Sequence, residues 1–132
     1  MKSVNELQNE IIRLGKIIDA PESYLKIGDG FEVVCNVEIH DDEYHYVLVE
    51  RGIERKRIIS KSASDIMYLF VESASHGLAS NYELENRIPG QDFRRLLFKK
   101  QLELLEKICP EWARKRQEEL TEILESHPYD DK

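Results

Sequence analysis

The six residues HDDEYH, His40 to His45, include five side chains that can bind a metal ion. Imidazole nitrogens suit zinc, and carboxylate oxygens suit both zinc and harder divalent cations. The segment mixes positions of a turn with positions of a strand, and no second ligand cluster with the spacing of a metal site follows it. We therefore predict no metal site, although His40, Asp41, Asp42, Glu43 and His45 are considered as ligands.

A second possible chemistry is metal-dependent nucleic-acid cleavage. Asp42 followed by Glu54-x-Lys56 has the order of the Asp…Glu-x-Lys site of restriction-type nucleases. In such a site the carboxylates hold a metal that activates water, and the lysine supports the nucleophile. The pattern is short, and glutamate and lysine alternate on many exposed strands. A nuclease is therefore the alternative hypothesis rather than the first.

Charge argues against nucleic acid as the partner. The chain has 26 Asp and Glu residues against 19 Lys and Arg, a formal net charge of -7, whereas binding to phosphate backbones is driven by excess positive charge. An acidic surface instead favours encounter with a basic protein. There is also no Gly-x-Ser-x-Gly motif, no glycine-rich phosphate loop and no Cys-x-x-Cys pair. We predict no enzyme, no catalytic residue and no cofactor.

The elements that position these residues are predicted from periodicity, and they give an α+β fold in a single domain, residues 1–132. A capping box of Ser3 and Glu6 opens a helix that runs to about Ile18. Alternation then predicts a strand over residues 31–39, starting at Phe31, with two further strands over 44–52 and 53–60. Short connections make them an antiparallel meander, followed by three to four α-helices packed on the sheet.

The segment GQDFRRLLFKKQLELL, from Gly90 to Leu105, is predicted to be an amphipathic helix that starts at Asp92. Phe93 is expected on its core-facing side, and Arg95 is expected to pair with Asp92. Arg94 lies on the border of the apolar side, where it could bind a carboxylate of another element or belong to an interface. A last helix begins at Pro110, and its Arg116 is expected to extend past Trp112 towards solvent.

Three segments carry a resemblance to a known family: YHYVLVERG, YELENRIPGQDFRRLLFKKQLELLEKICPEW and RKRQEELTEIL. In order and spacing they resemble the immunity protein 63 family of bacterial polymorphic toxin systems. The resemblance implies a small cytoplasmic α+β protein that binds and silences a cognate toxin domain without catalysis. It supplies no active site, and the motif residues could equally be scaffold: Glu50, Arg51, Tyr82, Gly90, Gln91, Asp92, Arg94, Arg95 and Trp112.

A toxin-binding surface should expose acidic and aromatic side chains, because many toxin domains are basic nucleases and binding hot spots favour aromatic anchors beside complementary charge. Arg94 is one candidate, and the others form three sets along the chain. They are Asp41, Asp42, Glu43, Tyr44 and Tyr46; then Tyr82, Glu83 and Glu85; then Glu118, Glu119, Glu122 and Glu125.

The expected partner is thus a cognate toxin domain, with basic nucleases as one class. No nucleic acid or membrane partner is predicted, and a monomer and a homodimer both remain open. The first ten residues lack the apolar stretch of a signal peptide, and no run of about 20 apolar residues follows. The expected location is the cytoplasm.

Overall fold

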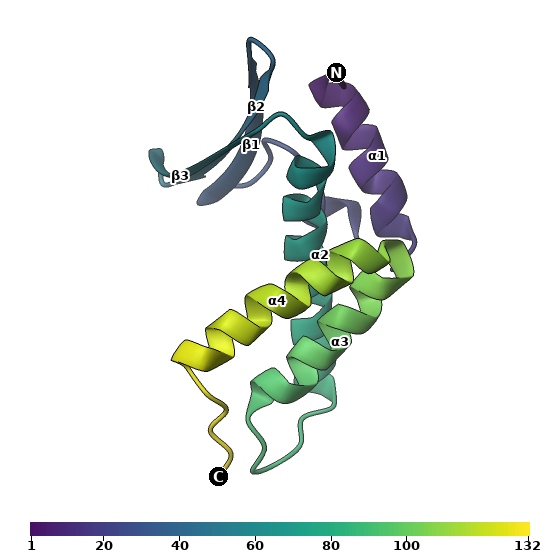
Figure 1. Ribbon diagram of the computed structural model, residues 1–132, viewed down its shortest axis with the longest axis vertical. Coiled ribbons are helices and arrows are strands. Elements are labelled where there is room, and N and C mark those ends of the chain that lie inside the picture. Colours follow the sequence, from purple (N-terminus) through teal and green to yellow (C-terminus); the bar gives the residue numbers. More distant parts are fainter. The chain divides into compact units, whose positions relative to one another are not determined.

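The protein is represented by a computed structural model that describes all 132 residues. It contains four α-helices and one three-stranded antiparallel sheet in the order predicted (Figure 1), so the α+β class is confirmed. The chain forms two compact units, residues 1–71 and 72–132. Helix α2 (Ala63–Glu85) begins in the first unit and ends in the second.

Helix α1 (Val4–Lys16) starts where the capping box predicts. The Glu6 backbone N–H donates to Ser3 Oγ at 3.1 Å, and the Ser3 N–H donates back to the Glu6 carboxylate at 3.0 Å. The helix ends two residues earlier than Ile18, because the following turn brings Asp19 into the left-handed region, at φ 55°. Of its apolar residues, Leu7 and Ile11 are fully buried.

The sheet is a meander in the order β1–β2–β3, formed by β1 (Val33–His40), β2 (Glu43–Glu50) and β3 (Ile53–Ser60). Two-residue turns join the strands, and Arg51 and Gly52 in the second turn both have positive φ, 51° and 81°. Such a turn matches the right-handed twist of the strands it connects. The first turn fixes the pairing of Glu38 with His45, whereas a bulge at Arg55 shifts the register of β3 by one residue, so that His45 lies opposite Ile59.

The predicted start of the first strand at Phe31 is wrong. The strand begins at Val33, and Phe31 is 98% exposed. Gly28 and Gly30 precede it with φ of 74° and 139°, so the chain is still bending at this point. The apolar character of Phe31 matched the alternation of the strand, but the backbone there is not yet extended alongside β2.

One face of the sheet is covered within the first unit. Tyr44 and Tyr46 point to this face and are 1% and 8% exposed. The Tyr44 hydroxyl donates to the Lys2 carbonyl at 2.7 Å, and the Tyr46 ring meets Phe70 of α2 edge to face at 5.4 Å. This covering gives the sheet a buried face and a face that carries charged side chains.

The second unit contains the end of α2 and the helices α3 (Phe93–Ile108) and α4 (Pro110–Ser126). Cys109 alone connects α3 to α4, in an extended conformation, and Pro110 occupies the first position of α4 as predicted. Figure 1 shows α3 and α4 running back from this corner side by side. The core cluster of this unit joins Ala79 of α2 to Leu97 and Phe98 of α3 and Leu120 of α4.

A buried polar network joins the three helices of this unit. Gln101 is fully buried and donates to the Glu72 carbonyl at 3.0 Å and to Ser75 Oγ at 3.2 Å. Arg116 Nε donates to the Gln101 side-chain oxygen at 3.1 Å, and its guanidinium pairs with Glu72 and Glu119, each at 3.2 Å. The expectation that Arg116 extends to solvent is therefore wrong, because it finds a carboxylate and an amide inside the bundle.

Replacing Gln101 with Leu should lower the free energy of unfolding by about 2–3 kcal/mol, because it leaves the part-buried Arg116 Nε without its acceptor and removes the amide that links α2 to α4. Urea denaturation followed by circular dichroism measures the change. Gln117→Leu, at an exposed position of the neighbouring helix, is the matched control and should change stability by less than about 0.5 kcal/mol. Equal losses in the two variants would contradict a stabilising role for the network.

Candidate functional site

The tip of the β1–β2 hairpin is the most exposed part of the first predicted surface. Asp41 and Asp42 form the two-residue turn, both exposed, and Asp41 has φ 55°. Aspartate is among the few residue types that accept this conformation readily. Glu43 follows at the start of β2, with a carboxylate oxygen 3.8 Å from His45 Nε2. Three carboxylates thus gather at one end of the sheet.

Tyr44 and Tyr46 do not belong to an exposed surface, contrary to expectation. Strand alternation turns both towards the covered face, where Tyr46 also donates its hydroxyl hydrogen to Cys35 Sγ at 3.1 Å. Alternating YHYV does not reveal which face is covered, since histidine and valine could equally point inward. The structure shows that the tyrosines build the core of the first unit and are not available as aromatic anchors.

Of the three residues of the second predicted surface, at the end of α2, two are exposed and one is buried. Glu83 is 3% exposed, and Arg87 donates to both of its oxygens at 2.9 and 2.8 Å. These hydrogen bonds hold the pKa of Glu83 below its usual range. Tyr82 and Glu85 are exposed as predicted, and Lys100 Nζ lies 4.5 Å from the centroid of the Tyr82 ring.

The third predicted surface forms an acidic stripe on α4. Glu118, Glu122 and Glu125 are exposed, and their spacing of four and three residues places them on one line along the helix. Glu119 lies off this line, is half-buried and pairs with Arg116. The stripe therefore consists of three carboxylates whose side chains are free to meet a partner.

The nuclease arrangement of Asp42, Glu54 and Lys56 is not assembled. Asp42 lies in the β1–β2 turn, whereas Glu54 pairs with Val49 near the other end of β2. The length of β2 between them is roughly 20 Å at ~3.4 Å per residue, far more than two ligands of one metal ion can span. Arg57 donates to both oxygens of Glu54, at 2.9 and 2.7 Å. No group of three or more His, Cys, Asp or Glu side chains is placed to hold a metal ion.

The open face of the sheet carries a charged network that the sequence does not reveal. Arg57 donates to Glu54, to Glu38 at 3.3 Å and to His45 Nδ1 at 2.8 Å. His40 Nε2 lies 2.7 Å from the same Glu38, and its ring centroid is 4.4 Å from that of His45. Hydrogen bonds that Glu38 accepts from His40 and Arg57 keep its pKa below the usual range. These contacts depend on strand register, so sequence spacing could not identify them.

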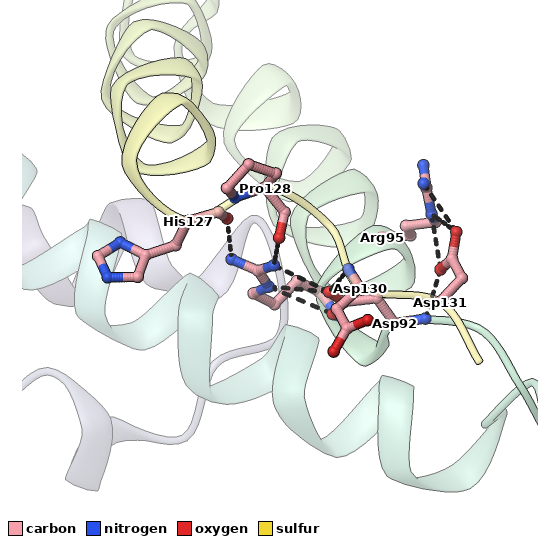
Figure 2. Close-up of polar contacts among 7 residues, drawn as sticks. Asp92, Arg95, His127, Pro128, Asp130 and Asp131 are labelled. Atoms are coloured by element: carbon pink, nitrogen blue, oxygen red, sulfur yellow. Dashed lines mark hydrogen bonds and ion pairs between the residues drawn. The ribbon is translucent and has the colours of Figure 1, made fainter.

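Arg94 fastens the last residues of the chain to the start of α3; Figure 2 labels its partners Asp92, His127 and Pro128. Its guanidinium pairs with Asp92 at 2.8 Å and donates to the carbonyls of His127 and Pro128, each at 2.8 Å. Asp92 caps α3 by accepting the Arg94 backbone N–H at 2.9 Å, and it also accepts the Asp130 N–H at 2.8 Å. We call this set of contacts the tail clasp. The carboxylate that Arg94 was expected to find belongs to its own helix cap.

Arg95 extends the tail clasp by pairing with Asp131 at 2.9 Å, instead of with Asp92 as predicted. Figure 2 shows this pair beside the Asp92 contacts. The Arg95 guanidinium carbon lies 4.1 Å from the Tyr129 ring centroid, a favourable cation–π position. At Gly90, φ is 81° and a Cβ atom would lie 2.8 Å from the Lys132 carbonyl oxygen. The basic residues of the GQDFRR motif thus have structural partners.

An open pocket of about 440 Å³ lies beside the tail clasp. Its lining includes Ile88 and Phe93, which are 47% and 51% exposed, together with the charged residues Arg87 and Lys132. Phe93 was expected to face the core. As the first residue of α3 it lies beyond the helical core contacts, so it opens to solvent instead.

These features define the class of protein: a small α+β protein with exposed acidic surfaces at the β1–β2 hairpin and on α4. Residues 41–122 match the family model described as immunity protein 63. The match covers more than half of the chain, and the chain belongs to this family. No curated protein and no solved structure matches it. None of its helices combines the length and apolar character needed to cross a membrane.

The tail clasp should make stability depend on pH through Asp92. The hydrogen bond from Arg94, followed by the backbone N–H groups of Asp130 and Arg94, holds the pKa of Asp92 well below its usual range. A carboxyl group with a lowered folded-state pKa stabilises the fold above the unfolded value of about 4, and this contribution is lost as pH falls further. Asp92→Asn should therefore be less stable than the wild type at pH 7, and the difference should shrink below about pH 4.

Thermal denaturation between pH 7 and pH 2 measures this difference. Glu122→Gln, which removes an exposed carboxylate of α4, serves as the control and should leave the midpoint almost unchanged at every pH. A difference for Asp92→Asn that stays constant down to pH 2 would show that the ionised carboxylate is not what stabilises the clasp.

Arg94→Lys should loosen the tail while keeping the charge. A lysine ammonium cannot reproduce the planar fork that reaches Asp92 and two carbonyls at once. Amide hydrogen exchange at Asp130 and Lys132, whose N–H groups donate to Asp92 and to the Gly90 carbonyl, should become at least about tenfold faster. Lys99→Ala, on the exposed side of the same helix, should leave these rates unchanged.

Proposed function

We propose that this protein is an immunity protein that binds a cognate toxin domain of a bacterial polymorphic toxin system and neutralises it by protein–protein contact, without catalysis. The observation that carries the proposal is the family match over residues 41–122. It runs from the tip of the β1–β2 hairpin into α4, and so it includes the hairpin tip and, of the α4 stripe, Glu118 and Glu122. The protein acts in the cytoplasm of the cell it protects, as a monomer or a homodimer.

The surfaces best suited to the toxin are the hairpin tip, Asp41, Asp42 and Glu43, and the α4 stripe, Glu118, Glu122 and Glu125. Both are exposed and acidic, and a basic toxin such as a nuclease would be steered towards them. Tyr82 and Glu85 offer a smaller contact with an aromatic ring. Glu83, Glu119 and Arg94 already have partners inside the protein, so their role is to hold these surfaces in place.

The test uses the toxin domain encoded beside the gene for this protein. Co-expression should rescue cell growth, and the two purified proteins should form a complex that blocks the activity of the toxin. The variant Asp41→Asn/Asp42→Lys should weaken the complex at least about tenfold, because it replaces attraction to a basic surface by repulsion. Asparagine is chosen at position 41 because it accepts the left-handed backbone found there.

Glu103→Gln/Glu106→Lys is the matched control, since it changes the charge equally at exposed positions of α3. It should bind the toxin as the wild type does. Failure of the wild-type protein to bind or inhibit the toxin domain would overturn the proposed function. If both variants weakened the complex equally, the hairpin tip would be excluded as a specific part of the interface. The proposed function would still stand, because the wild-type protein would bind the toxin.

A further inference from the structure

Strand β3 and its flanks are basic in an otherwise acidic protein. Residues 50–61 contain five basic side chains, Arg51, Arg55, Lys56, Arg57 and Lys61, against the two carboxylates of Glu50 and Glu54. Five consecutive residues of the strand, Ile53 to Arg57, are exposed, so here solvent reaches the side chains of both faces. The strand therefore displays positive charge in two directions.

β3 is also an edge strand, with β2 as its neighbour on one side. The N–H and C=O groups along the other side of an edge strand are available to pair with another extended chain. The opposite edge of the sheet is different, because the Gly28 N–H already donates to the Cys35 carbonyl of β1 at 2.8 Å. Part of the β1 edge is thus taken, whereas β3 is an edge strand over its whole length.

Several of the cations on β3 are not neutralised within the protein. Arg55 lies 3.7 Å from Glu50, and Arg57 is held by Glu54 and Glu38. Arg51, Lys56 and Lys61 form no ion pair, and they lie before, within and after the strand. Repulsion between such edges disfavours pairing with a second copy of this chain. The same charges would complement an acidic segment.

We propose that β3 is the docking edge for an extended acidic segment of the toxin, which adds to the sheet as a fourth strand. This inference rests on the proposed function for the identity of the partner. Backbone hydrogen bonds would supply affinity, as in other cases of strand addition, and the cations would select acidic side chains. Exposed Ile53 and Ile59 add apolar contact. Nucleic acid is the weaker candidate, because the chain as a whole carries a net charge of -7.

The first experiment uses the full chain and three labelled probes of equal length, about eight residues. They are a peptide that alternates Glu with Val, the same peptide with N-methylated backbone amides, and oligothymidylate. The first peptide should bind and slow amide hydrogen exchange in Ile53 to Ser60, whereas the N-methylated peptide should not. Binding of both peptides with equal affinity, or of oligothymidylate alone, would overturn the proposal, as would unchanged exchange in β3.

The second experiment uses Lys56→Glu/Lys61→Glu, with Lys99→Glu/Lys107→Glu on α3 as a control of equal charge change at exposed positions. Circular dichroism checks that both variants are folded. The β3 variant should bind the acidic peptide and the toxin domain at least about tenfold more weakly than the control variant does. Equal affinity of the two variants for the toxin would overturn the docking edge but leave the proposed function standing.

The opposite outcome is equally distinguishable. If the toxin domain binds neither variant nor the wild type, the proposed function fails. Protection of β3 by the acidic peptide, lost in Lys56→Glu/Lys61→Glu, would then still support an edge strand that receives acidic segments.

Discussion

The register of the β-meander is set by its two two-residue turns and one bulge in β3, and the position of every charged group on the sheet depends on that register. Arg51 and Gly52 both adopt positive φ, and Asp41 does so in the first turn. A slip of one residue would exchange the two faces of a strand. Tyr44 and Tyr46 would then meet solvent, whereas His45 would be carried into the core. Burial of the tyrosines and the turn geometry support the same pairing, which keeps Asp42 and Glu54 at opposite ends of β2.

The second unit uses its charges differently, because many of them bind inside the protein. Arg116 reaches Glu72 and Gln101, and Arg94 reaches Asp92 and the carbonyls near the end of the chain. These contacts explain why basic residues occur along helices whose other faces are apolar. By contrast, the carboxylates of the α4 stripe, Glu118, Glu122 and Glu125, form no ion pair within the protein. A protein that meets both the hairpin tip and β3 would need basic and acidic regions at matching positions.

Features set by neighbours in sequence were predictable, and features set by distant partners were not. Ser3 and Glu6 satisfy each other across one helical turn, so the start of α1 follows from their spacing. Arg95 had a suitable carboxylate in Asp92 but pairs with Asp131, which only the folded chain brings near. The predicted exposure of Tyr44 and Glu83 was wrong for a similar reason. Alternation and helical spacing give the face on which a residue lies but not what covers that face. The charged network around Arg57 required the register of three strands.

Three connections between elements are short: two residues at each turn of the meander and the single residue Cys109 between α3 and α4. Each strand pairs with its neighbour in sequence, and α3 packs against the helix that follows it. Topologies dominated by such local contacts lose little chain entropy before native contacts form, and they fold quickly. Rapid folding after synthesis would suit a protein whose proposed task is to capture a toxin made in the same cell. The short connections would then favour rapid folding as well as a stable fold.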